Sequence, residues 1–144
     1  MSELPQRISL REVGPRDGLQ NEDPVPTEGK VALIDALSRT GVRRIEAVSL
    51  VHPDAIPQMA DATEVWARID RNPDVRYSAL VPNLRGAQRA LDAGFPEIEV
   101  VVSASDTHNR RNIRRCKPVR TFPARPRAKY GPCLLQCLMQ RRKP

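Results

Sequence analysis

Apolar, β-branched runs alternate with segments of helical period over the first two thirds of the chain, and a glycine or proline marks most of the changes. This punctuation separates short segments that suit strands from longer ones that suit helices. Because strands that alternate with helices pair in parallel, we expect an α/β fold of about four strands and three helices. The predicted strands are residues 8–13, 44–47, 75–81 and 98–102, and the predicted helices are residues 28–40, a segment around Trp66 that ends at residues 72–73, and residues 84–91.

Polar residues with short side chains precede each predicted helix and are expected to cap it. Thr27 is the expected N-cap of the first helix, Asp61 with Glu64 resembles a capping box for the second, and Asn83 caps the third. Glycines supply the C-terminal stops of the first and third helices, at positions Gly41 and Gly94.

The balance of charge changes abruptly along the chain. Residues 1–106 hold 12 basic and all 17 acidic side chains, whereas residues 107–144 hold 12 basic side chains and no acidic one. The overall pI of about 10.0 therefore reflects a local excess. Residues 116–144 also show no helical or alternating apolar period, and prolines recur among them. We predict a folded domain over residues 1–115 and a disordered basic Pro/Arg-rich tail over residues 116–144.

All three cysteines, Cys116, Cys133 and Cys137, lie in the predicted tail. Cys133 and Cys137 could form half of a zinc site, but no second cysteine pair or histidine lies near them. A disulfide framework has no more support. The cysteines therefore point to no metal centre.

An arginine and an aspartate stand side by side where the first predicted strand stops. Arg16 can neutralise developing negative charge, and Asp17 can ligate a divalent cation. Pro15 and Gly18 flank the pair and favour a turn at this point. The pair has the composition of half an active site.

Eleven consecutive positions around this pair, residues 12–22, resemble the first strand and loop of the hydroxymethylglutaryl-CoA lyases, members of a metal-dependent lyase and synthase superfamily. The resemblance continues through residues 45–61, 80–86 and 102–109 and fades after about Arg115. Synthases of the same superfamily, which condense acetyl-CoA with 2-oxo acids, share Arg-Asp-Gly but typically carry Asp-Thr-Thr-Leu before it. This chain has Glu-Val-Gly-Pro there, so the lyase branch fits better and the condensing synthase remains the alternative.

The resemblance implies a fold, the (β/α)8 TIM barrel, of which this chain would supply only the first portion. A complete barrel takes eight strand-helix units and roughly 250 residues. An incomplete barrel leaves edge strands with unpaired amides, through which we expect aggregation or a homo-oligomer.

The resemblance also implies a retro-Claisen cleavage of 3-hydroxy-3-methylglutaryl-CoA, an acyl-CoA substrate, to acetyl-CoA and acetoacetate. Asp17 would ligate Mg²⁺ or Mn²⁺, and Arg16 would stabilise the acetyl-CoA enolate. Glu46 would be the acidic residue that orients the arginine or a ligand histidine. Gln20 would contact substrate or metal-bound water, or pack its own loop.

Several family features have no counterpart in this chain. These are the His-x-His metal ligands, an asparagine ligand and a catalytic cysteine in a glycine-rich loop. His52 and His108 do not form that pair and are expected to be loop histidines. We therefore expect this chain to be inactive alone.

The acid-free tail suggests that a frameshift replaced the native continuation, and two functions follow for the chain. One is a lyase by ancestry. The other is a non-catalytic truncated product whose basic tail binds anionic partners. For nucleic acid we expect no more than non-specific contact by the tail. Residues 1–6 offer no signal sequence and no apolar run is long enough to cross a membrane, so a cytoplasmic location is expected.

Overall fold

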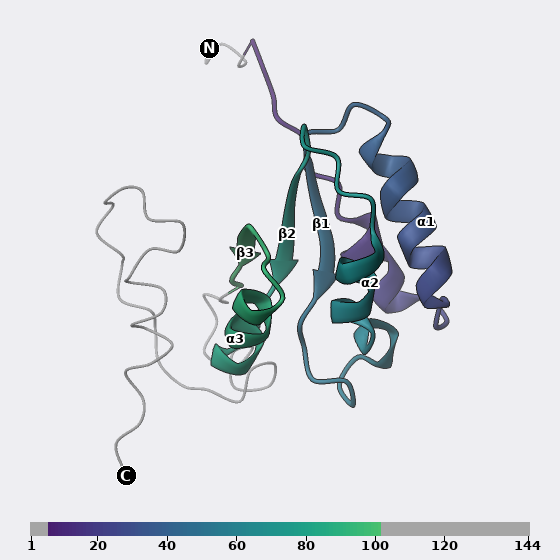
Figure 1. The fold of residues 1–144 in the computed structure, drawn as a ribbon, viewed down its shortest axis with the longest axis vertical. Coiled ribbons are helices and arrows are strands. Elements are labelled where there is room, and N and C mark those ends of the chain that lie inside the picture. Colours follow the sequence, from purple (N-terminus) through teal and green to yellow (C-terminus); the bar gives the residue numbers. More distant parts are fainter. Residues whose placement is uncertain (1–5, 102–144) are drawn as a thin grey trace, which may run out of the picture.

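A computed structural model describes residues 6–101 and shows a three-stranded parallel sheet with helices between the strands (Figure 1). The strands are β1 (Arg44–Ser49), β2 (Arg76–Leu80) and β3 (Glu97–Glu99), in the order β1-β2-β3. The helices are α1 (Thr27–Ser38), α2 (Ala62–Arg68) and α3 (Leu84–Asp92). Over the described residues, this confirms the predicted parallel α/β class and its three helices.

Three short helical turns complete the described part of the chain. A π-helical turn, η1 (Gly14–Gly18), runs directly into a 3-10 turn, η2 (Leu19–Asn21), before α1 begins. A second 3-10 turn, η3 (Pro57–Met59), leads into α2. The segment that carries the Arg-Asp pair is therefore helical rather than an open loop.

The apolar core lies between the helices and one face of the sheet, which we call the outer face. Trp66 of α2 is 3% exposed, stacks on Phe95 with ring centroids 4.1 Å apart, and donates from Nε1 to the carbonyl of Ala93 at 2.8 Å. The expected core position of Trp66 is thus confirmed. The same cluster takes side chains from all three helices and from β1 and β2, including Ile34, Val65, Ala87, Ala90, Ile45, Tyr77 and Ala79.

The first predicted strand, residues 8–13, is wrong as a strand. A single parallel bridge joins Glu12 to Ile45: the Glu12 amide donates to Arg44 and the Glu46 amide donates to Glu12, both at 2.8 Å. No other residue of this segment forms a bridge in the described part of the chain, so no ladder forms along it. Ile8 and Leu10 are accordingly 76% and 69% exposed. Residues 6–101 therefore contain three strands rather than four.

Of the three predicted N-caps, one is confirmed and two are wrong. Asn83 caps α3 by accepting from the Gly86 amide at 3.0 Å. Asp61 precedes α2 but caps nothing with its side chain, because its carboxylate accepts hydrogen bonds from Lys30 and Thr27 instead. Thr27 is the first residue of α1, which has Pro26 as its N-cap. The two side chains that the sequence assigns to local capping, Thr27 and Asp61, instead form a tertiary hydrogen bond with each other.

Both glycines expected to stop helices adopt the left-handed conformation, Gly41 with φ 89° and Gly94 with φ 74°. Strand β3 ends at Glu99, so predicted strand 98–102 is confirmed for residues 98 and 99 and wrong for residues 100 and 101, and residue 102 lies outside the described residues. The predicted tail, residues 116–144, and the boundary before it lie outside the described residues. Within residues 6–101, no helix is long and apolar enough to cross a membrane.

Candidate functional site

The face of the sheet opposite the helices, the inner face, is polar. In a parallel sheet, paired residues point to the same side. Strand β2 pairs Ser78 with Glu46 and Glu97, and Leu80 with Ser49 and Glu99. These six residues define the inner face. Its charge contrasts with the apolar cluster on the outer face.

Turn η1 packs against β1 and delivers Arg16 to the inner face. The amides of Arg16 and Asp17 both donate to the carbonyl of Val13, at 3.0 and 2.6 Å, and so fix the start of the turn. Pro15 is buried in its first turn, where a missing amide donor costs little. The flanking residues that predicted an open turn instead build a compact helical one.

The Arg16 guanidinium is held between two carboxylates. Its Nε donates to Glu46 Oε1 and its NH1 donates to Asp17 Oδ1, both at 2.6 Å. Glu46 is 3% exposed and Arg16 is 15% exposed at its side chain, so the pair is shielded from water. Because a guanidinium carries five N–H donors, these two bonds leave donors to spare. The arrangement fixes Arg16 without saturating it.

Glu46 lies within β1, which continues to Ser49, rather than closing the strand as predicted. Its carboxylate is also 3.9 Å from Arg11, whose NH1 forms a closer pair with Glu99 at 2.9 Å. Sequence reasoning did not single out Arg11 or Glu99. The available signal was charge at the inward positions of strand-like segments. Glu46 thus receives two guanidinium groups.

Asp17 is 53% exposed at its side chain and lies at the open side of this cluster. Its Oδ1 accepts from Arg16 and, at 3.1 Å, from Gln20 Nε2. The structure therefore brings together Arg16, Asp17, Gln20 and Glu46. To bind a divalent cation, Asp17 would need further ligands beside it. Residues 6–101 contain no group of three His, Cys, Asp or Glu side chains that could hold such an ion.

The histidines do not join the site in the described part of the chain. His52 is 67% exposed and lies 3.6 Å from the carboxylate of Asp54, which is itself 91% exposed. This matches the expectation of a loop histidine. His108 lies outside the described residues.

A buried lysine in α1 forms hydrogen bonds with the segment between β1 and α2. Lys30 is 6% exposed, and its Nζ contacts Asp61 Oδ1 at 2.6 Å and the carbonyl of Gln58 at 2.5 Å. Gln58 in turn donates to the carbonyl of Glu22 at 3.1 Å. This Lys30 network anchors η3 beside η2, and no helical period in the sequence would have predicted a buried lysine.

The Lys30 network also sets the charge of Asp61. Burial by itself raises the pKa of the Asp61 carboxyl, but hydrogen bonds from Lys30 and Thr27, with the Lys30 charge, outweigh it. The pKa of Asp61 therefore lies below its ordinary value. The ion pair is formed at neutral pH.

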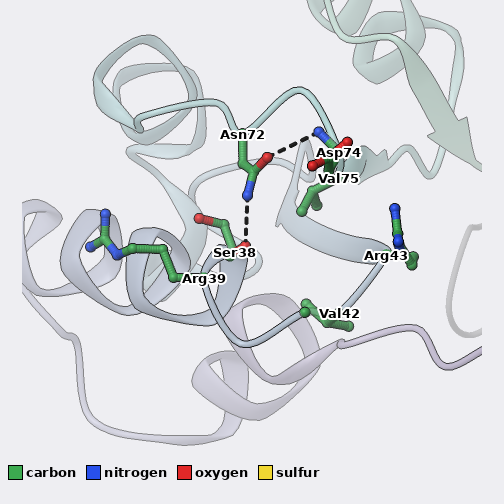
Figure 2. Close-up of a pocket in the computed structure, with 8 residues that line it drawn as sticks. Ser38, Arg39, Val42, Arg43, Asn72, Asp74 and Val75 are labelled. Carbon is green, nitrogen blue, oxygen red and sulfur yellow. Dashed lines mark hydrogen bonds between the residues drawn. The ribbon is translucent and has the colours of Figure 1, made fainter.

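A pocket of about 180 Å³ opens at the other end of the sheet, near the amino ends of β1 and β2 (Figure 2). Asn72 bridges its wall by donating to the carbonyl of Ser38 and accepting from the Asp74 amide, both at 2.9 Å. None of the predicted site residues lines it. The pocket and the Arg16 cluster are separate features.

The described architecture agrees with what known proteins show. The family model described as HMGL-like matches residues 7–121. A hydroxymethylglutaryl-CoA lyase of Bacillus subtilis is 52% identical over 112 residues, which are 77% of this chain and 38% of that lyase. A cytoplasmic 3-hydroxy-3-methylglutaryl-CoA lyase of Danio rerio is 53% identical over 114 residues, 78% of this chain and 34% of the relative. The chain thus spans little more than a third of the length of these relatives.

Solved structures give the same result. The crystal structure of the Bacillus subtilis lyase matches with a TM-score of 0.74 at 52% identity and covers 77% of this chain and 38% of that one. A lyase of Acinetobacter baumannii in complex with coenzyme A and 3-methylmalate matches with a TM-score of 0.76 at 47% identity, over 81% of this chain and 39% of that one. The chain therefore belongs to the HMGL-like family and is homologous to part of the hydroxymethylglutaryl-CoA lyases that it matches.

Proposed function

We propose that this chain carries the first portion of a hydroxymethylglutaryl-CoA lyase active centre, built on the first units of a (β/α)8 barrel. The observation that carries the proposal is the Arg16 guanidinium held at 2.6 Å by both Glu46 and Asp17 on the polar face of the sheet. The substrate class follows from the relatives, one of which binds coenzyme A and a hydroxy dicarboxylate.

Arg16 is the group proposed to stabilise charge in the reaction. Retro-Claisen cleavage removes the proton of the tertiary hydroxyl and breaks the adjacent carbon–carbon bond. The bonding electrons go to the acetyl-CoA fragment, as an enolate that is then protonated. Donors that Glu46 and Asp17 leave unused on Arg16 can bind that enolate oxygen. A preorganised donor of this kind contributes about 3–4 kcal/mol to the transition state.

Glu46 is proposed as the positioning residue for Arg16. Its carboxylate is buried and accepts from the guanidinium Nε, so it holds the planar fork in one orientation. A second guanidinium, that of Arg11, lies 3.9 Å from the same carboxylate. Gln20, which donates to Asp17 at 3.1 Å, is proposed to orient that aspartate and to face the substrate.

We propose that a divalent metal ion, Mg²⁺ or Mn²⁺, needs ligands beyond those that the described residues supply. Asp17 offers one exposed carboxylate, and a single carboxylate does not hold a catalytic cation against water. Residues 6–101 therefore fit a metal only as contributors of one ligand. For this reason we expect no turnover from residues 6–101 by themselves.

A graft tests the proposal. Residues 7–121, the span that matches the family, replace the corresponding span of the Bacillus subtilis lyase, and acetoacetate release from 3-hydroxy-3-methylglutaryl-CoA is measured with Mg²⁺. We expect the graft to cleave the substrate. A folded graft without activity would contradict the proposal.

Substitutions in the active graft assign the role of Arg16. Arg16→Gln and Arg16→Lys are both expected to lower kcat by about 10²–10³-fold, because lysine lacks the planar fork. Arg39→Gln is the matched control, since Arg39 is an exposed arginine beside the pocket at the other end of the sheet. Equal rates for Arg16→Gln and Arg39→Gln would remove Arg16 from the chemistry.

A further inference from the structure

Ser49 ends strand β1 and carries a hydroxyl that the fold leaves unused. The residue is 0% exposed, and its Oγ has no hydrogen-bond partner in the part of the chain that the structure describes. A buried hydroxyl without a partner costs roughly 1–3 kcal/mol. Among residues 6–101 it is the only fully buried side-chain polar atom in this state, so it calls for an explanation.

A register irregularity turns this hydroxyl towards the polar side of the sheet. Along a regular strand, Glu46 and Ser49 are three residues apart and would point to opposite faces. The pairing of β1 with β2 shifts between Glu46 and Val48, so that Glu46 lies opposite Ser78 and Ser49 lies opposite Leu80. Because Ser78 and Leu80 are two apart on β2, Glu46 and Ser49 share the inner face.

Bulges of this kind are common next to active sites, where they re-aim a side chain at the expense of the ladder. In this chain the shift moves a serine from the apolar face, where the helices would cover it, to the face that carries Arg16 and Glu46. It also leaves Ala47 without a partner on β2. The register shift and the unpartnered hydroxyl together place a free hydrogen-bond donor on the inner face, at the carboxyl end of β1.

We propose that Ser49 is a substrate-binding residue whose hydroxyl donates to a carboxylate oxygen of the acyl substrate. This inference rests on the proposed function and adds a residue to it. The chemical class is a hydroxy dicarboxylic acid, whose oxygens need donors beyond one guanidinium. A ligand oxygen would satisfy the hydroxyl that the fold does not.

The proposal predicts opposite effects on stability and on binding. Ser49→Ala removes an unsatisfied group, so the urea midpoint of the 144-residue chain should stay the same or rise. Ser38→Ala is the matched control, because Ser38 is equally buried at 3% exposed but its Oγ bonds the carbonyl of Asp35 at 2.8 Å. That control should lower the midpoint and leave binding unchanged.

Binding is measured on the graft of residues 7–121 into the Bacillus subtilis lyase, by titration with 3-hydroxy-3-methylglutarate in the presence of Mg²⁺. Ser49→Ala is expected to weaken binding by about 5-fold to 10-fold, the value of one hydrogen bond. Ser49→Cys keeps a similar shape with a weak donor and should bind as the alanine variant does. Arg16→Gln reports on the proposed function separately.

The outcomes separate the two claims. A lower urea midpoint for Ser49→Ala, as for Ser38→Ala, overturns the inference because the hydroxyl then has an internal partner. Weaker binding by Arg16→Gln with unchanged binding by Ser49→Ala overturns the inference and leaves the proposed function in place. Failure of the unsubstituted graft to bind, or equal binding by all of its variants, counts against both.

Discussion

The two faces of the β1-β2-β3 sheet differ in what holds them together. The outer face packs apolar side chains under three helices, with Trp66 stacked on Phe95 at 4.1 Å. The inner face carries ion pairs, Arg16 with Glu46 at 2.6 Å and Arg11 with Glu99 at 2.9 Å. Burial of apolar area drives folding, whereas the desolvation of buried charges offsets much of what an ion pair contributes. The fold therefore rests on one face, and the other is free to serve chemistry.

The largest effect should come from the outer face. Trp66→Ala removes a side chain that is 3% exposed and the hydrogen bond to Ala93. We expect a loss of about 3–5 kcal/mol in the free energy of unfolding, measured by urea denaturation followed by circular dichroism. Trp66→Phe, which keeps an aromatic ring, should cost clearly less. A small loss for the alanine variant would mean that the outer face does not carry the fold.

The Lys30 network is expected to have the next largest effect. Lys30→Met keeps the apolar stem but leaves Asp61, which is 21% exposed at its side chain, without its cation. We expect a loss of about 2 kcal/mol in the free energy of unfolding. Arg68→Met, which breaks the exposed pairs of Arg68 with Glu28 and Glu64, is the control and should leave the urea midpoint nearly unchanged.

Acid should weaken the Lys30 network in a defined direction. The pKa of Asp61 is lower in the folded chain than its ordinary value of 3.8, so the ionised carboxylate stabilises the fold at pH values above about 4. This stability is lost as the pH falls through the folded pKa. At neutral pH the urea midpoint of Asp61→Asn should therefore lie below that of the unsubstituted chain. Below pH 4 the difference between the two midpoints should shrink. A constant difference at all pH values would refute the assignment.

The smallest effect is expected on the inner face, away from Arg16. Arg44 pairs with Glu97 at 3.2 Å, and both side chains are about one-third exposed, at 36% and 32%. Arg44→Ala should change the free energy of unfolding by less than about 1 kcal/mol, and added salt should reduce the difference further. A loss as large as that of Trp66→Ala would erase the contrast between the faces.

Sequence patterns predicted what depends on local chemistry. Asn83 caps α3 because its short side chain reaches an amide three residues on, and Gly41 and Gly94 stop helices because they adopt positive φ.

Contacts between distant residues were the part that sequence could not supply. Asp61 has the spacing of a capping box, but Lys30, 31 positions earlier, takes its carboxylate. Residues 8–13 alternate as a strand does, yet a strand exists only where a neighbour pairs with it along its length. The orientation of Ser49 depends on a pairing shift between β1 and β2 that leaves no mark in the sequence.

The central claim is that the inner face holds part of a lyase active centre while the outer face holds the fold. The most direct test is acetoacetate release by the grafted Bacillus subtilis lyase with Arg16 and with Gln at that position. We predict that the unsubstituted graft is active and that Arg16→Gln lowers kcat by about 10²–10³-fold in a graft that circular dichroism shows to be folded. A graft that keeps its activity after Arg16→Gln would contradict the account.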